Sequence, residues 1–200
     1  QLRKTNPDTQ IHTYSVEGAA LDGIHSLVAT DIRTTQHGSS FQLHTAHGSG
    51  NVRTHLIGRF NVSNALAIAA VLSIRGVPFT QLVNLLESLQ AVPGRMQQLG
   101  GVDAPLVVID YAHTPDALQK VLDTLRPVAA ARHGALWCVF GCGGERDPGK
   151  RPQMGLAADR ADHIMVTSDN PRSEDPAQII AQIVAGVPTA RRQKLQIIED

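Results

Sequence analysis

Residues 167–176 read Thr-Ser-Asp-Asn-Pro-Arg-Ser-Glu-Asp-Pro, and this stretch joins a predicted strand to a predicted helix. The preceding run, His-Ile-Met-Val at 163–166, is typical of a short buried strand, whereas 179–184 places isoleucines and a valine on one helical face. Asp175 and Pro176 supply an N-cap side chain and a proline at the first helical position. The helix therefore does not need residues 169–172, whose acid, amide and guanidinium groups follow a strand and are available to a ligand. An ordinary turn with a surface arginine is the alternative.

Two further apolar runs, 106–109 and 135–140, also read as strands, and each is followed by an amphipathic or short helix. Pro115 is expected to open the helix after the first of them, with Thr114 as its cap. Continuous apolar strands that alternate with helices predict an α/β fold with a parallel sheet covered on both faces.

The ends of these three strands are expected to lie along one edge of the sheet. They carry residues 110–113, the glycine-rich loop 141–151 and the turn 169–172. The glycine-rich loop matches neither the dinucleotide fingerprint nor the P-loop, so it is a weak phosphate signal by itself. Arg146 and Arg172 could hold carboxylates through bidentate pairs. Asp110 suits a ribose hydroxyl or a magnesium-bound water, although helix capping explains Asp110 and Thr114 nearly as well.

Residues 11–57 alternate between apolar and polar side chains and predict an antiparallel meander with tight turns. Six histidines lie in this part of the chain, and five of them are considered as metal ligands. A metal cluster is conceivable, but ligand sets need convergent geometry that this spacing does not impose, so solvated strand histidines are the favoured interpretation. The five are His12, His37, His44, His47 and His55.

A helix that is apolar almost all round follows, from about residue 58 to Gly76, and it is expected to be buried on most sides. Asn61 and Asn64 share a face of its first turn. Capping can explain one of these amides, and a pair directed at a base or a ribose is an equal alternative. A second amphipathic helix and a linker at 91–94 complete this half.

Composition bounds the class of protein. The 200 residues are 42% hydrophobic, and 18 basic side chains balance 18 acidic ones, which gives no electrostatic reason to expect a nucleic acid or a membrane surface as partner. No run is long enough to span a membrane and the amino end lacks a signal core, so a cytoplasmic protein is expected. Cys138 and Cys142 are expected to be reduced, one structural and one incidental. The chain is expected to be a piece of a longer protein.

Five stretches, in order along the chain, resemble motifs of the Mur ligases, and the likeness covers nearly the whole chain. It is strongest to members that add meso-diaminopimelate to UDP-N-acetylmuramoyl-L-alanyl-D-glutamate. The one departure noted is Glu145, where relatives often carry aspartate. The stretches are Phe60–Ala65, Pro93–Met96, Asp110–Leu118, Phe140–Pro152 and Asp169–Arg172.

The resemblance implies a domain organisation and a set of binding residues. Residues 1–92 would end a central ATPase domain of antiparallel strands plus helices, and 93–200 would begin a Rossmann-like parallel-sheet domain that binds the amino acid. ATP would be held by Asn61, Asn64, Arg95, Asp110 and His113. Meso-diaminopimelate would be held by Arg146, Asp169, Asn170, Pro171 and Arg172.

The implied reaction is the formation of an amide through an acyl phosphate, in peptidoglycan synthesis. ATP phosphorylates the side-chain carboxylate of the glutamate, and the amine of diaminopimelate then attacks. The partners would be these small molecules with Mg²⁺, no nucleic acid or membrane is implied, and a monomer is expected. No catalytic residue or metal ligand is assigned within the chain. These 200 residues lack three features of the family: the P-loop lysine, a magnesium-ligand set and the later Gly-Lys-Gly-His-Glu stretch. They are therefore not expected to catalyse the reaction by themselves.

Rival interpretations remain open at this stage. A lysine-adding Mur ligase would use the same scaffold, but Arg172 argues against it because diaminopimelate carries a distal carboxylate that lysine lacks. A non-catalytic module that binds nucleotide or amino acid would keep the loops without the catalytic core. A dinucleotide-dependent oxidoreductase is a distant third, since the loop at Gly141 lacks the fingerprint.

Overall fold

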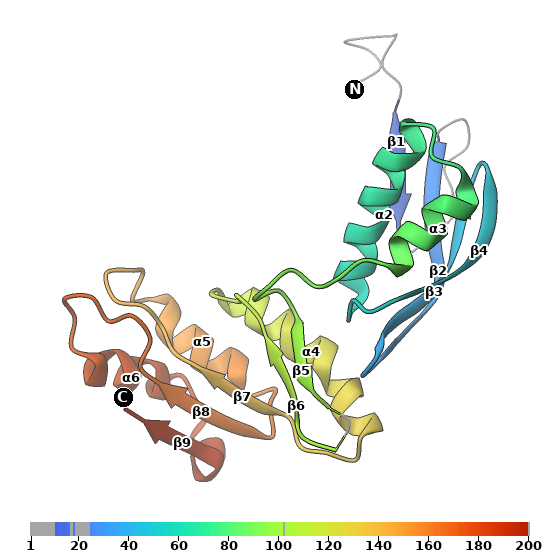
Figure 1. Ribbon diagram of the computed structural model, residues 1–200. Coiled ribbons are helices and arrows are strands. Elements are labelled where there is room, and N and C mark those ends of the chain that lie inside the picture. Colours follow the sequence, from blue (N-terminus) through green and yellow to red (C-terminus); the bar gives the residue numbers. More distant parts are fainter. Residues whose placement is uncertain (1–10, 17, 19–24, 102, 200) are drawn as a thin grey trace. The chain divides into compact units, whose positions relative to one another are not determined.

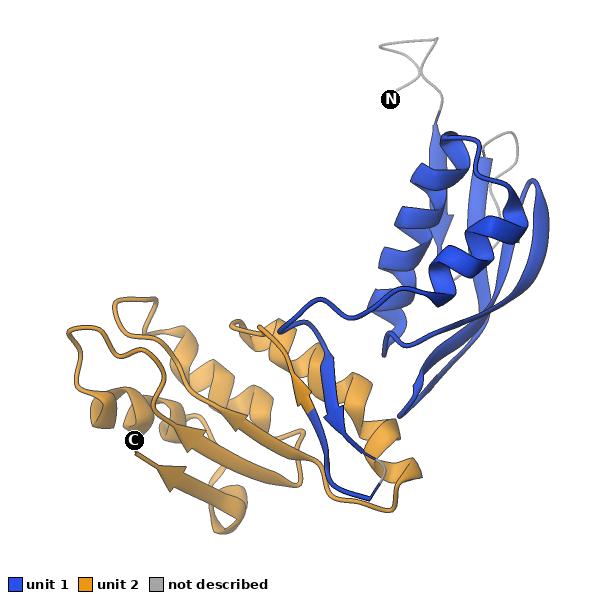
Figure 2. Cartoon of the chain, in the orientation of Figure 1, with its two compact units in different colours: residues 1–107 blue, residues 108–200 orange. Residues whose placement is uncertain are grey.

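The computed structural model describes residues 11–16, 18, 25–101 and 103–199. The chain forms two compact units, residues 1–107 and 108–200 (Figures 1 and 2). The division falls within β6 (Leu106–Ile109), which pairs with β5 (Gln97–Gly100) in a two-stranded sheet. Strand β5 is absent from the sequence-based expectations. Within the described ranges, no helix has the length and apolar character needed to cross a membrane.

The first unit contains a sheet of four strands in the order β1-β2-β3-β4. They are β1 (His12–Ser15), β2 (His25–Thr35), β3 (Gly38–Thr45) and β4 (Gly48–Thr54). The last three are antiparallel, as the alternating sequence predicts. Strand β1 pairs with β2 in parallel, so the prediction of an antiparallel meander from its first strand is wrong. Alternation identifies a strand, but it carries no information about the direction of its neighbour.

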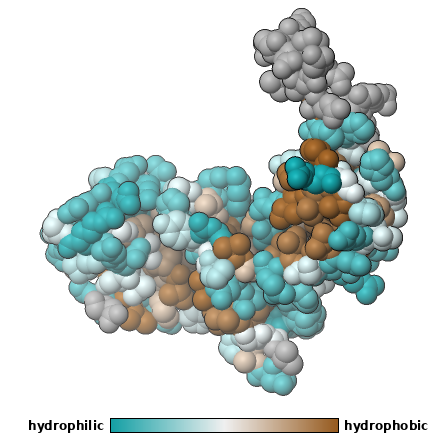
Figure 3. All heavy atoms as spheres, turned by 45° about the horizontal axis from the view of Figure 1, so that its top comes forward, coloured by the Kyte–Doolittle hydropathy of each residue, from teal (hydrophilic) through white to brown (hydrophobic). Residues whose placement is uncertain are grey.

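Helices α2 (Arg59–Ile74) and α3 (Phe79–Glu87) pack on this sheet. Helix α2 buries Val62, Leu66 and their small neighbours against the strands. Its opposite side leaves Val71 60% exposed, so the expectation of burial on most sides is only partly met. The sheet covers only one side of α2, so apolar side chains on the other side of this helix stay at the surface of the unit. Figure 3 shows apolar residues gathered on the surface of this unit.

The second unit has a three-stranded sheet in the order β7-β8-β9, whose strands are all parallel, as predicted for β7 and β8. The prediction that 106–109 is also a strand of this sheet is wrong for the described residues, because β6 pairs with β5 in a separate sheet. Helices and strands alternate along the chain. The elements are α4 (Pro115–Ala131), β7 (Trp137–Phe140), α5 (Lys150–Ala158), β8 (His163–Thr167), α6 (Pro176–Ala185), a 3₁₀ helix (Thr189–Lys194) and β9 (Leu195–Ile198).

The helices of the second unit pack on one face of this sheet. Cys138, Ile164 and Val166 point into a core shared with α4, α5 and α6, whereas Trp137 and Val139 on the alternate positions are 47% and 60% exposed. The prediction that both faces are covered is therefore wrong for the described residues. Right-handed crossovers place successive helices on the same face when the strand order runs in one direction, as it does from β7 to β9.

The predicted start of two helices is confirmed. Thr114 Oγ1 accepts a hydrogen bond from the Ala117 amide at 3.3 Å, and Asp175 Oδ1 accepts one from the Ala177 amide at 3.0 Å, with proline at the first helical position in both cases. Caps of this kind satisfy amides that the first helical turn leaves without partners. Helices α4 and α6 therefore begin directly after the loops that follow β6 and β8.

Helices α5 and α6 approach each other closely at Gly155. A Cβ atom on Gly155 would lie 2.1 Å from the carbonyl oxygen of Ile183, a distance that real Cβ atoms do not reach. The absence of a side chain at this position therefore sets the spacing of the two helices, whose amino ends carry the loops at the sheet edge.

Both cysteines are free and buried. Burial raises the pKa of the Cys138 thiol to about 12, as expected for a structural strand cysteine. Cys142 also belongs to the core of the second unit, so it is not the incidental residue that its place in a loop suggested.

Asp162 links α4 to the start of β7. Its Oδ2 accepts hydrogen bonds from Arg126 Nη1 at 2.7 Å and from the Leu136 amide at 2.8 Å. The Leu136 amide first, and then Arg126 and the more remote Lys194, lower the pKa of this carboxyl.

We expect Asp162 to make the second unit acid-sensitive. A lowered pKa in the folded state adds stability above the ordinary aspartate pKa of about 3.9, and this is lost as pH falls through the lowered value. Stability measured by hydrogen exchange of β7 and β8 should therefore fall less steeply below about pH 4 in Asp162→Asn than in the parent. Equal slopes in the two proteins would contradict this role.

Candidate functional site at the strand ends of the second unit

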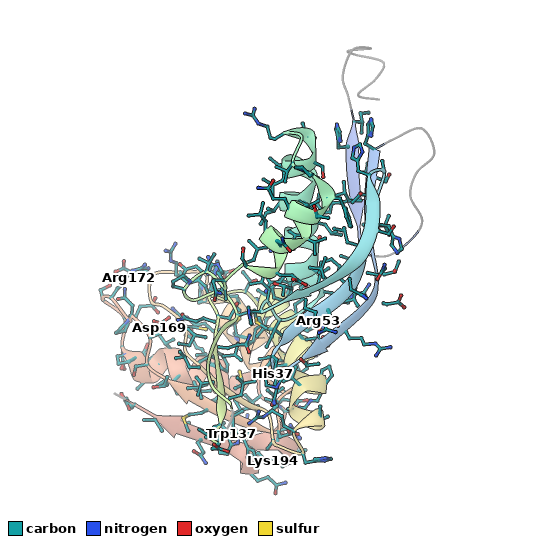
Figure 4. The ribbon with its side chains drawn as sticks, turned by 45° about the vertical axis from the view of Figure 1, so that its right-hand side comes forward. His37, Arg53, Trp137, Asp169, Arg172 and Lys194 are labelled. Carbon is teal, nitrogen blue, oxygen red and sulfur yellow. The ribbon has the colours of Figure 1, made fainter. Side chains whose placement is uncertain are left out.

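The loops that follow β7 and β8 lie side by side because the two strands are parallel neighbours. Phe140 and Val166 are in register, so residues 141–149 and 168–175 leave the sheet at the same edge. Figure 4 shows Asp169 and Arg172 beyond this edge, and Trp137 and Lys194 at the opposite end of the strands. The polar turn therefore lies where a parallel sheet can bind ligands.

Backbone contacts interlock the two loops. The Gly144 amide donates to the carbonyl oxygen of Asn170 at 2.9 Å. A Cβ atom on Gly144 would lie 1.8 Å from the carbonyl oxygen of Pro171, and one on Gly141 would lie 2.6 Å from that of Thr167. The glycines in this loop are therefore needed for close backbone approach, a reason independent of phosphate binding.

Arg172 occupies an unusual position at the centre of the turn. Its φ of 53° lies in the left-handed region, and its Nη1 donates to the Gly144 carbonyl oxygen. Asp169 Oδ1 accepts from the Asn170 amide at 2.8 Å, which fixes the start of the turn. The side chains of Asp169, Asn170, Arg172 and Arg146 are exposed. Two guanidinium groups and an acid–amide pair are thus presented on adjoining loops.

Arg151 and Glu174 contribute an ion pair behind these loops that the sequence analysis did not anticipate. Arg151 Nη1 lies 2.8 Å from Glu174 Oε2. Hydrogen bonds from Arg151 and from the Glu145 amide hold the pKa of Glu174 below its ordinary value. The sequence did contain a signal for the burial of Arg151. This residue shares a helical face with Met154, Gly155 and Ala158, which are all buried.

The loop after β6 reaches the same region of the second unit. Lys150 Nζ, at the start of α5, donates to the carbonyl oxygen of His113 at 2.9 Å. The His113 ring bonds to the Tyr111 carbonyl oxygen through Nδ1 at 3.0 Å and lies edge-on to the Tyr111 ring. Asp110 lies at the start of this loop, and its side chain is partly exposed. The loop after β6 thus contacts the start of α5, although β6 pairs with β5 in a separate sheet and does not share an edge with β7 and β8 as the sequence predicts.

Asn61 and Asn64 lie in the first turns of α2, in the first unit. Asn64 Nδ2 donates to Asn61 Oδ1 at 3.5 Å, so the two amides do share a face. Asn61 Nδ2 donates to the Ile57 carbonyl oxygen at 2.9 Å. The N-cap of α2 is Gly58, without a side-chain cap bond, so capping explains neither asparagine.

Arg95 belongs to the turn between α3 and β5, also in the first unit. Its amide donates to the Val92 carbonyl oxygen at 2.9 Å, and its side chain is exposed. Gly94 before it and Met96 after it both have positive φ, and Met96 is buried. The buried methionine anchors the turn beside the arginine.

The site residues suit charged organic ligands better than a metal on its own. Among the described residues, no group of three or more His, Cys, Asp or Glu side chains is placed to hold a metal ion. Of the histidines in this sheet of the first unit, His44 bonds to the Thr30 hydroxyl at 3.1 Å, and His12 stacks on His25. Arginines bind carboxylates, and an Asp–Asn pair can accept from an ammonium group. The exposed groups on these loops are therefore chemically suited to an amino acid.

Comparison with protein families gives two matches. Residues 94–200 match the model described as Mur ligase, glutamate ligase domain, and residues 1–72 match the Mur ligase middle domain. A UDP-N-acetylmuramoyl-L-alanyl-D-glutamate--2,6-diaminopimelate ligase of Janthinobacterium sp. (strain Marseille) is 58% identical over 200 residues, which are 100% of this chain and 39% of the relative. The chain thus spans about two fifths of that relative's length.

Solved structures show the same likeness. A structure of UDP-N-acetylmuramoyl-L-alanyl-D-glutamate--2,6-diaminopimelate ligase matches with a TM-score of 0.64 at 38% identity, covering 100% of this chain and 39% of that one. Mycobacterium tuberculosis folylpolyglutamate synthase complexed with ADP matches with a TM-score of 0.64 at 23% identity, over 86% of this chain and 38% of that one, which shows the fold alone.

Proposed function

Because this chain belongs to the Mur ligase family, we propose that its full-length protein is an ATP-dependent ligase that adds meso-diaminopimelate to UDP-N-acetylmuramoyl-L-alanyl-D-glutamate. The observation that carries the proposal is the turn Asp169–Arg172, which presents an acid, an amide and a guanidinium at a strand end. The 58% identity to a ligase of that name supports the same substrate.

The amino acid is proposed to bind to the second unit. Arg172, with Asn170 and Arg146, would hold the distal carboxylate of diaminopimelate, because a guanidinium pairs with a carboxylate through two parallel hydrogen bonds. Asp169 would attract the ammonium group beside that carboxylate, and Pro171 would keep the turn extended before Arg172. This arrangement would position the other amine for attack on the activated glutamate.

Five residues of this chain are proposed to bind the nucleotide. Asn61 and Asn64 would lie near the adenine, Arg95 and Asp110 near the ribose and phosphates, and His113 beside them. ATP with Mg²⁺ supplies the phosphoryl group that activates the glutamate carboxylate. The residues of this chain would bind and orient the nucleotide, and no proton transfer or metal ligation is assigned to them.

The domain organisation is proposed to follow the family. Residues 1–92 would end the central domain and 93–200 would begin the carboxyl-terminal domain. The full-length protein is proposed to be a cytoplasmic monomer, with these small molecules as its partners.

Phosphate release by the full-length protein tests the proposal. The protein is given ATP, Mg²⁺ and UDP-N-acetylmuramoyl-L-alanyl-D-glutamate, with meso-diaminopimelate or L-lysine in turn. We expect release with diaminopimelate, and none from residues 1–200 alone. Release with lysine instead would favour the lysine-adding ligase and reject the role of Arg172. No release with either, despite nucleotide binding, would favour the non-catalytic module.

A further inference from the structure

Arg151 differs from every other charged residue in the part of the chain that the structure describes, because it alone is buried. Its side chain is 1% exposed, at the amino end of α5. A buried guanidinium is costly unless it is paired and hydrogen-bonded. The contacts that compensate for its burial therefore indicate what this residue holds in place.

Those contacts come from three separate segments. Arg151 Nη1 and Nη2 donate to Glu174 Oε2 and Oε1 at 2.8 and 2.9 Å, which is a bidentate pair. Nη1 also donates to Gln182 Oε1 of α6 at 2.7 Å, and Nη2 to the Gly143 carbonyl oxygen at 3.3 Å. The guanidinium thus joins α5 to α6, to the turn after β8 and to the loop after β7.

Glu174 extends this connection to the exposed side of the loops. Its Oε1 also accepts from the Glu145 amide, and Ser173, beside it, donates to the Glu145 carboxylate. Glu174 lies two residues after Arg172, and Glu145 directly precedes Arg146. The Gly144 carbonyl between these contacts accepts from Arg172. The backbone at both exposed arginines is therefore fixed, directly or through one residue, by the Arg151–Glu174 pair.

We propose that Arg151 and Glu174, which we call the loop clamp, are positioning residues that hold Arg146 and Arg172 in the geometry that binds the amino acid. This inference rests on the proposed function for its substrate. The loop clamp does not touch the amino acid, and it acts through the backbone of the two loops. Lysine cannot replace Arg151, because an ammonium lacks the planar fork that grips both carboxylate oxygens.

Kinetics of the full-length protein test the loop clamp through the variants Arg151→Lys and Glu174→Gln. We expect KM for meso-diaminopimelate to rise about 10-fold or more, because small misplacements of binding groups are costly, whereas KM for ATP stays within about 2-fold. Glu174→Asp, which keeps the charge, should have a smaller effect. The control is Asp123→Asn, which weakens the 2.8 Å surface ion pair with Arg160 in the same unit and should change neither constant.

Hydrogen exchange provides a readout that does not require activity. In Glu174→Gln the Gly144 and Glu145 amides should exchange at least about 10-fold faster than in the parent, because their loop contacts loosen. Circular dichroism establishes that each variant is folded. If Glu174→Gln does not fold, the exchange experiment is carried out with Glu174→Asp instead. Unchanged exchange, or equal rises in both KM values, would overturn the loop clamp. A parent protein without diaminopimelate-dependent phosphate release would instead reject the proposed function and, with it, the substrate assigned to the loop clamp.

Discussion

Arg172→Ala in the full-length protein is expected to reduce the preference for meso-diaminopimelate over L-lysine by a factor on the order of 10⁴ in kcat/KM. A site built to bind a carboxylate leaves its arginine unpaired when the ligand lacks that group, and removing the arginine removes this discrimination. Arginine and alanine tolerate the φ of 53° at this position similarly, so the change adds little backbone strain.

The measurement is kcat/KM for each amino acid, with ATP and the UDP-linked substrate held constant. Arg172→Lys should recover little of the preference, because lysine does not form the bidentate pair. Arg160→Ala, at an exposed arginine that pairs with Asp123, is the matched control and should keep the parent ratio. An Arg172→Ala protein as selective as the parent would refute the assignment of Arg172.

Gly155→Ala is expected to destabilise the second unit by about 3 kcal/mol. The new Cβ would lie 2.1 Å from the Ile183 carbonyl oxygen, a backbone atom that can move away only if α5 and α6 separate. The free energy of unfolding of the second unit, measured by native-state hydrogen exchange at β8, checks this expectation.

Gly134→Ala provides the matched control for that experiment. The nearest atom to a Cβ at Gly134 is the Ala129 carbonyl oxygen at 3.9 Å, an ordinary contact. Its effect on stability should stay within about 1 kcal/mol. If both variants were equally stable, the close approach at Gly155 would not set the spacing of the helices.

Local signals in the sequence predicted the features that depend on neighbouring residues. Thr114 and Asp175 cap helices as expected, because a cap requires only a side chain and the amide two or three residues later. The parallel strands β7 and β8 were predicted from their apolar runs and the helices between them. These features predict from sequence alone that the turn Asp169–Arg172 lies at a sheet edge.

Features that depend on distant partners were not predicted. The parallel pairing of β1 and the uncovered face of the second sheet follow from strand order, which alternation does not encode. The burial of Arg151 depends on Glu174 and Gln182, which are 23 and 31 residues away in sequence. The assignments of Asn61, Asn64, Arg95, Asp110 and His113 to ATP stay predictions, since they rest on the family resemblance.

The interlock between Gly144 and Pro171 also bears on how substrate preference can change during evolution. Inserting or deleting a residue in either loop would separate backbone atoms that are in contact, so both loops are expected to keep a constant length among descendants of this protein. Arg146 and Arg172 are exposed, and although Arg172 donates to the Gly144 carbonyl oxygen, the bond between Gly144 and Asn170 is made by backbone atoms alone. A new amino-acid preference is therefore expected to arise by single side-chain replacements. At position 172 the left-handed backbone favours glycine, asparagine or aspartate as the successor.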